Sequence, residues 1–75
     1  MNGLPRIDMA RTGQNIIAIR KKQGISVKDL QRVFNFATPN AIYKWQRGEA
    51  LPTVDNLIVL SSVLSVSVED IIATA

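Results

Sequence analysis

The segment NAIYKWQR, residues 40–47, combines side chains suited to hydrogen bonding with two large apolar ones. In a helix, Ile42 and Trp45 lie three residues apart and share one face, whereas Asn40 and Lys44 project from the opposite face. An amide that both donates and accepts, next to an ammonium group that donates, is equipped for recognition by hydrogen bonds. The segment therefore predicts a short helix with a polar binding face and an apolar face that anchors it.

Catalytic chemistry has few candidate residues in this chain. Histidine and cysteine are both missing from the sequence, which removes the usual general base at neutral pH, the commonest zinc ligand and any thiolate nucleophile. Ser61, Ser62 and Ser65 have no evident base partner, and the sequence contains neither paired carboxylates nor a glycine-rich phosphate loop. We expect a protein that is not an enzyme and that uses no metal and no cofactor.

Charge is divided unevenly along the 75 residues. Residues 1–48 hold all nine Lys and Arg side chains with two acids, a net charge of +7, whereas residues 49–75 hold four acids and no base. This distribution indicates that the first part faces a polyanion. The sequence predicts neither a membrane span, which needs roughly 20 apolar residues, nor a secretion signal. We expect a cytoplasmic protein without membrane contact.

Helix start and stop signals divide the chain into elements. Residues 1–7 are expected to form a flexible N-terminal arm, and residues 8–75 one folded domain. The first helix is expected to be capped by Asp8 or Thr12 and to end at Gly24, a residue suited to the position after a helix.

Two shorter helices are expected to follow. Ser26 is a good N-cap for VKDLQRVF, and Asn35 accepts the left-handed conformation that ends such a helix. Thr38 is expected to cap the next helix with Pro39 as its first residue, and Gly48 to end it.

Thr53 and Ser67 are expected to cap two final helices, so the sequence predicts an all-α bundle of five short helices. Apolar residues at helical spacing predict the core. They are Ile16, Ile19, Val27, Leu30, Val33, Phe34, Phe36, Ile42, Trp45, Leu57, Leu60, Val63 and Leu64.

Two short helices at about residues 26–34 and 38–47, joined by a tight turn, have the dimensions of a helix-turn-helix. Over residues 12–73 the chain resembles the phage-repressor-like (Cro or XRE-type) helix-turn-helix proteins, through IRKKQGIS, VKDLQRVF and AIYKWQRGEALPTVDNLIVLSSVLSVSVEDII. The resemblance implies a lambda-repressor-like fold and sequence-specific binding to double-stranded DNA. It implies a small bacterial or phage transcriptional regulator, expected to be a repressor, with residues 38–47 in the major groove.

The resemblance also implies which residues contact DNA. Pro39, Asn40, Tyr43 and Lys44 fall at positions that usually face bases, where Asn40 could pair with adenine and Lys44 could donate to guanine. Tyr43 is equally consistent with a packing or solvated role. The expected phosphate contacts are Thr38, Arg47 and the start of the second helix at Val27 and Lys28.

Two features depart from the family pattern. The turn NFAT is one residue longer than usual, which predicts a rotated or shifted helix after it. Arg20 and Gln46 stand where family members often pair an arginine with a glutamate, although glutamine still accepts a hydrogen bond from the guanidinium.

Alternatives remain open at the C-terminus and for the function. Ile71 and Ile72 are adjacent, so one helix face does not easily bury both. They either complete the core or contribute to a homodimer through the C-terminal helices. The same fold would also suit an antitoxin that binds a toxin and represses its own promoter, or a protein-interaction module that has lost DNA binding.

Overall fold

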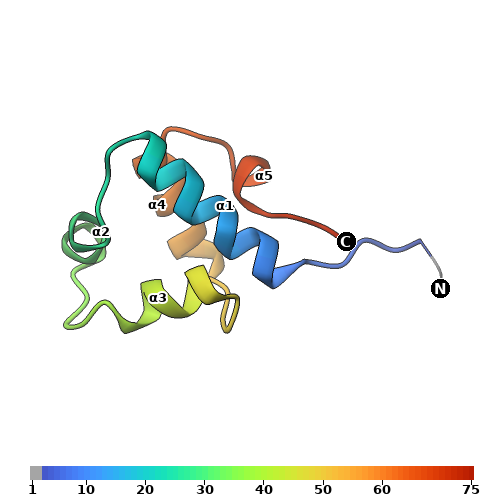
Figure 1. The fold of residues 1–75 in the computed structure, drawn as a ribbon, viewed down its shortest axis with the longest axis horizontal. Helices are drawn as coiled ribbons and strands as arrows, with labels where there is room; N and C mark the ends of the chain where they lie inside the picture. The colour runs from blue at the N-terminus through green and yellow to red at the C-terminus, as the bar shows by residue number, and fades with distance from the viewer. Residues whose placement is uncertain (1–2) are drawn as a thin grey trace.

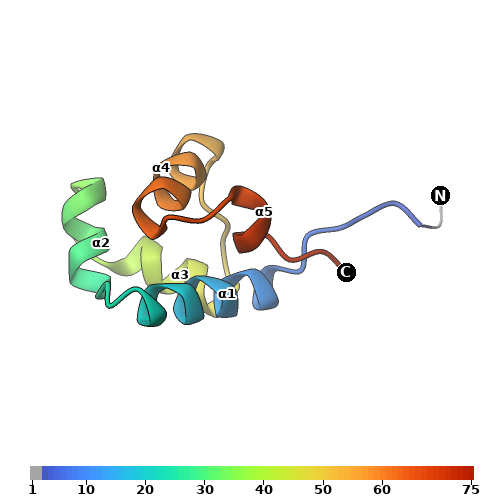
Figure 2. The ribbon, with the colours of Figure 1, turned by 90° about the horizontal axis from the view of Figure 1, so that it is seen from above.

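The computed structural model describes residues 3–75, and over that range the chain forms five α-helices and no strand. The helices are α1 (Met9–Lys22), α2 (Val27–Phe34), α3 (Asn40–Arg47), α4 (Val54–Leu64) and α5 (Val68–Ile71). Figure 1 shows α2 at one end of the molecule, and the first described residues and the C-terminus at the other. Figure 2 shows α4 on the side away from α1. The all-α prediction is confirmed.

Side-chain caps begin four of the five helices. Asp8 caps α1, which decides between the two predicted candidates, Asp8 and Thr12. Ser26 and Ser67 cap α2 and α5 in capping boxes, where the acid three residues later accepts from the backbone N–H of the serine. Thr53 caps α4 as predicted. Each cap satisfies backbone donors that a helix start leaves without an intrahelical acceptor.

The start of α3 differs from the prediction. Thr38 is not its N-cap and Pro39 is not its first helical residue, because Pro39 itself is the N-cap and the helix begins at Asn40. The Pro39 carbonyl accepts from the Tyr43 N–H at 3.1 Å, whereas the Thr38 hydroxyl accepts only a long 3.4 Å bond from the Asn40 N–H. Residues 35–39 all lie between α2 and α3. Thr38 and Pro39, which were predicted to begin α3, therefore belong to the turn.

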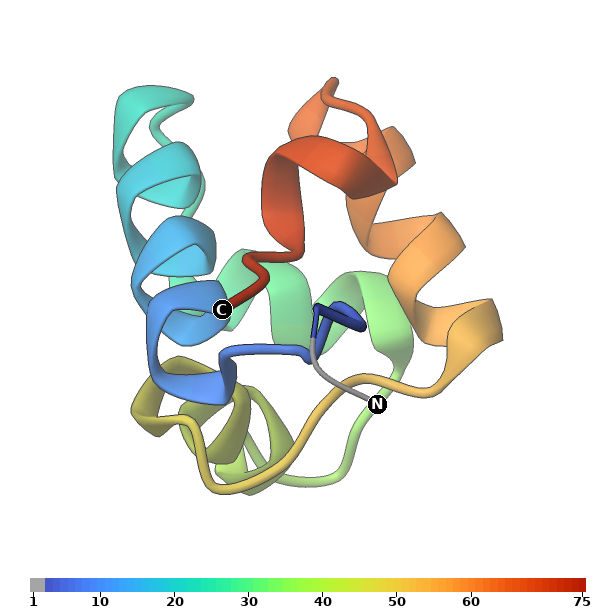
Figure 3. The ribbon, with the colours of Figure 1, turned by 90° about the vertical axis from the view of Figure 1, so that its right-hand side faces the viewer.

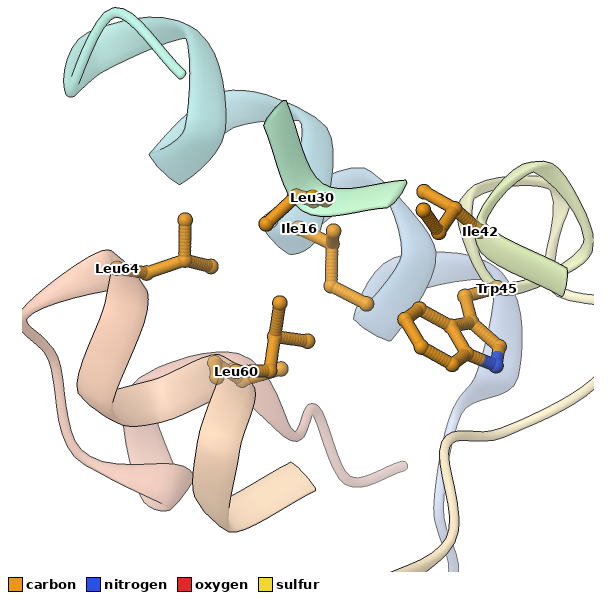
Figure 4. Close-up of a cluster of buried hydrophobic side chains, with 7 residues drawn as sticks. Ile16, Leu30, Ile42, Trp45, Leu60 and Leu64 are labelled. Atoms are coloured by element: carbon orange, nitrogen blue, oxygen red, sulfur yellow. The ribbon is translucent and has the colours of Figure 1, made fainter. Parts of the chain in front are cut away.

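The core joins side chains from all five helices. Figure 4 shows six of its side chains directed toward one another. The buried apolar cluster consists of Ile16, Leu30, Ile42, Trp45, Leu60, Leu64 and Ile71. Ile72 is half-buried. Val33 was predicted to join the core but is 48% exposed, because it lies beside the stripe of α2 that packs inward.

The two ends of the domain are held together. The Asp8 N–H donates to the Ala73 carbonyl and the Ala75 N–H to the Arg6 carbonyl, both at 2.8 Å. The Ala73 N–H also donates to the buried Thr12 hydroxyl at 2.9 Å, so Thr12 anchors the C-terminal segment. Figure 3 shows α5 between α1 and α4. Met1 and Asn2 of the expected arm lie outside the described residues, and the flexibility of the arm stays a prediction.

No helix within residues 3–75 combines the length and apolar character needed to cross a membrane.

Candidate nucleic-acid interface

The outer face of α3 presents the polar side chains that the sequence singled out. Asn40 and Lys44 are exposed, and Tyr43 is 42% exposed. On the opposite face Ile42 is fully buried and Trp45 is 5% exposed. Pro39, the fourth predicted base contact, is half-buried immediately before the helix. The structure therefore brings three predicted base-contacting side chains onto one accessible face, with the fourth residue at its N-terminal edge.

A close backbone approach holds α3 against α1. Gly13 is buried within α1, and an ideal Cβ placed on it would lie 2.8 Å from the carbonyl carbon of Gln46 and closer still to the carbonyl oxygens of Trp45 and Gln46. Only glycine permits this contact. A glycine inside a helical pattern costs about 1 kcal/mol relative to alanine, so its position could have signalled close packing from the sequence.

Arg20 makes a second link between α1 and α3. Its Nε donates to the Gln46 side-chain oxygen at 3.0 Å, and its Nη1 donates to the Ile25 carbonyl at 3.1 Å. The expected hydrogen bond between Arg20 and Gln46 is confirmed. One guanidinium thus joins α1 to the C-terminal half of α3 and to the loop before α2.

Replacing Gln46 with glutamate is expected to stabilise the domain. The Arg20–Gln46 pair is partly buried, and a carboxylate in place of the neutral amide oxygen would make it an ion pair, so we expect a gain of about 0.5–1 kcal/mol. Thermal unfolding at pH 7 measures it. Because the Arg20 guanidinium would lower the pKa of the new carboxyl, the gain should disappear as the pH falls below about 4. An unchanged or lower Tm at pH 7 would contradict the prediction.

The start of α2 combines a basic side chain with helix amide donors. Lys28 is exposed, whereas the Val27 side chain is half-buried against the core, so Val27 can offer its backbone N–H more readily than its methyl groups. The first N–H groups of a helix have no intrahelical acceptor and attract anions. Asp29 is bound within the capping box, and the hydrogen bonds from the Ser26 N–H and hydroxyl lower the pKa of its carboxyl.

The remaining predicted phosphate contacts differ in their surroundings. Thr38 is exposed in the turn. Arg47 is also exposed, but its Nε forms an ion pair with the Glu49 carboxylate just beyond α3. The sequence interpretation did not include Glu49 as a partner of Arg47, although a separation of two residues across a helix end permits it. An exposed ion pair of this kind contributes little to stability, about 0–1 kcal/mol, so Arg47 can exchange Glu49 for another anion.

Gln31 is a further residue that the sequence interpretation missed. Its side-chain Nε2 lies 3.2 Å from the Phe36 carbonyl and 3.3 Å from the Ala37 carbonyl. The long turn was the available signal, because each added residue brings a carbonyl that needs a hydrogen-bond donor.

Comparisons with known proteins agree with this architecture. A family model described as helix-turn-helix matches residues 16–71. The restriction-modification controller protein C.AhdI from Aeromonas hydrophila is similar in structure, with a TM-score of 0.75, 19% identity, and 85% of this chain and 96% of that chain covered. The DNA-binding domain of BldD is also similar, with a TM-score of 0.71 and 23% identity. The match covers 87% of this chain and 93% of that chain. No curated protein matches the sequence significantly.

The two solved structures share the arrangement of helices at low sequence identity, whereas the family model matches well over half of the chain, from α1 into α5. That matched range includes α2, the turn and α3. The chain therefore belongs to the helix-turn-helix family of the Cro/XRE type.

Proposed function

We propose that this protein binds double-stranded DNA sequence-specifically and regulates transcription, with α3 lying in the major groove. The observation that most directly supports this proposal is that α3 has two different faces. Ile42 and Trp45 are buried on one, and Asn40, Tyr43 and Lys44 are exposed on the other. An α-helix with its side chains is about 10–12 Å across, and the major groove, about 12 Å wide, accommodates one. The names of the two similar structures, a restriction-modification controller and a DNA-binding domain, support the proposal.

Base discrimination is assigned to the N-terminal part of α3. Asn40 offers an amide that pairs with the N6 and N7 edge of adenine, and Lys44 offers donors for the O6 and N7 acceptors of guanine. Tyr43 lies between them in sequence with its hydroxyl available, and Pro39 offers apolar contact to a thymine methyl. These assignments are supported by the exposure of Asn40, Tyr43 and Lys44 on one helix face.

Phosphate contacts are assigned to the surfaces beside α3. Lys28 and the first amides of α2, including that of Val27, would bind one phosphate group, and Thr38 and Arg47 would bind others. Arg47 would release Glu49 when a phosphate oxygen replaces the carboxylate. These contacts position the protein without reading sequence, so they should make binding sensitive to salt.

We also propose that two copies bind together, through their C-terminal helices. Val54, Ile58 and Val59 on α4 are 76%, 58% and 41% exposed, and Asp55 is the single charged residue of that helix. A second copy packed over this face would remove the apolar side chains from water. A complex of two copies would carry two α3 helices, the number that paired half-sites require.

Selection of bound sequences from a random duplex pool tests the proposal. We expect one motif to be enriched, arranged as a palindrome with half-sites about 10 base pairs or a multiple apart. For the enriched duplex, log affinity should fall with log salt concentration with a slope of about −2 to −4 for each copy, as for two to four neutralised phosphates.

Each outcome of the selection has a separate meaning. A single half-site would contradict the dimer and leave DNA binding intact. No duplex binding even at low salt would overturn the proposal, and a protein-interaction module would then explain the fold better. Purification with a second small protein bound at α4 would favour an antitoxin.

A further inference from the structure

We propose that Gln31 is a positioning residue that sets where α3 lies relative to α2, and that it thereby controls how well the protein discriminates between DNA sequences. The inference rests on the proposed function, because it concerns the placement of the base-contacting face. Gln31 itself lies on α2, outside the set of residues assigned to bases and phosphates. Its effect is exerted through the turn between the two helices.

Gln31 holds Phe36 through both polar groups of the Phe36 backbone. The Gln31 carbonyl accepts from the Phe36 N–H at 3.1 Å, and its side-chain Nε2 donates to the Phe36 carbonyl at 3.2 Å. The same nitrogen donates to the next carbonyl, that of Ala37, at 3.3 Å. A primary amide has two N–H donors, and both are directed at the turn. One residue of α2 therefore bonds three consecutive peptide groups, two of them through its side chain.

Phe36 transmits this position to α3 through its ring. The Phe36 ring stacks on Phe34 of α2, with centroids 5.2 Å apart and planes 13° apart. It also meets Trp45 of α3 edge to face, at 5.9 Å. Trp45 is nearly fully buried on the face opposite to Asn40 and Lys44. A displacement of Phe36 would therefore shift the anchored side of the helix and, with it, the exposed side.

The length of the turn explains why such a link is needed. Five residues, 35–39, separate α2 from α3, and α3 begins without a side-chain cap. Beside the turn lies an open hollow of about 230 Å³, lined by Lys28, Gln31, Arg32, Asn35 and Phe36. The hollow gives the turn space to move. Without the Gln31 hydrogen bonds, the turn could relax into that space and α3 could occupy several positions.

Gln31→Met tests the inference, because methionine keeps the length and helix propensity of glutamine and removes both donors. The wild type and the variant are compared for binding to the selected duplex and to a random duplex. We expect the ratio of the two affinities to fall roughly tenfold, as for the loss of one good base contact. Affinity for the random duplex should stay within about twofold, because the phosphate-binding groups are unchanged.

Three further variants make the result specific. Gln14→Met changes an exposed glutamine of α1 and should leave the ratio as in the wild type. Gln31→Glu, an isostere without donors, should lower the ratio as methionine does, and it keeps the test available if methionine destabilises the fold. Gln31→Lys restores a donor of similar reach and should therefore recover most of the affinity ratio. Its added positive charge raises the affinity for both duplexes alike and so does not change the ratio.

The outcomes separate this inference from the proposed function. If the wild type prefers its selected duplex and Gln31→Met prefers it equally, Gln31 does not position α3 and the inference is wrong, while DNA binding stands. If the wild type does not distinguish any duplexes, the proposed function fails and the inference fails with it. A fall in the ratio that Gln31→Lys does not recover would also overturn the assigned hydrogen bonds.

Discussion

Gly13→Ala is expected to destabilise the domain by about 3 kcal/mol, the upper end for an overpacked core. In a domain of this size that corresponds to a fall in Tm of roughly 12–24 °C. The added methyl group would overlap the carbonyl groups of Trp45 and Gln46, and backbone atoms cannot rotate away as a flexible side chain could. Either α1 and α3 separate or both helices bend.

The sign of this effect is informative. Helix propensity alone predicts that alanine at Gly13 would raise stability by about 1 kcal/mol, so an increase in Tm would contradict the packing of α1 on α3. Gly24→Ala is the matched control, because an added Cβ at Gly24 meets nothing within 4 Å. Its φ of +70° costs an L-residue about 1–2 kcal/mol, so we expect a smaller loss. Thermal or urea unfolding measures both variants.

Asn40→Ala and Lys44→Ala are expected to reduce affinity for the selected duplex by about 10- to 100-fold each, as for the loss of one bidentate base contact. The loss should be smaller on a random duplex, because a base contact contributes to sequence preference and a phosphate contact does not. Both side chains are exposed, so stability should change by less than about 0.5 kcal/mol. Fluorescence anisotropy with labelled duplexes gives the affinities.

Lys22→Ala is the control for charge. Lys22 is exposed in the last turn of α1, and its removal changes the net charge by the same amount as Lys44→Ala. We expect a small loss that is equal for the selected and the random duplex. Equal losses for Lys22→Ala and Lys44→Ala on both duplexes would show that Lys44 contributes only charge, and its assignment to bases would be withdrawn.

Local signals in the sequence predicted most of the elements. Caps such as Ser26, Thr53 and Ser67 act within three residues of themselves, so each can be identified without knowing the rest of the fold. Asn35 and Gly48 ended their helices at left-handed φ values of 55° and 74°, again by a local conformational preference. The exposed and buried faces of α3 follow from helical spacing, which is why the face bearing Asn40 and Lys44 was predicted correctly.

Features that depend on distant contacts were not predictable in this way. Thr12 resembles an N-cap, but the C-terminal segment reaches it and uses its hydroxyl. The start of α3 was misplaced because Thr38 and Pro39 have the composition of a helix start while the long turn uses both residues. The long turn indicated that its carbonyls need donors, but it did not indicate that Gln31 supplies them, because that depends on the path of the turn between α2 and α3.

The most direct test of the central claim is a titration of the ¹⁵N-labelled protein with its selected duplex, followed by the amide resonances. If α3 lies in the major groove, the largest shifts should occur from Asn40 to Lys44, with smaller ones at the start of α2 around Lys28. Amides of α4 around Ile58 should shift little once the dimer has formed. Shifts that are largest on α4 or α5 and small at Asn40 and Lys44 would contradict the assignment of α3 as the base-contacting helix.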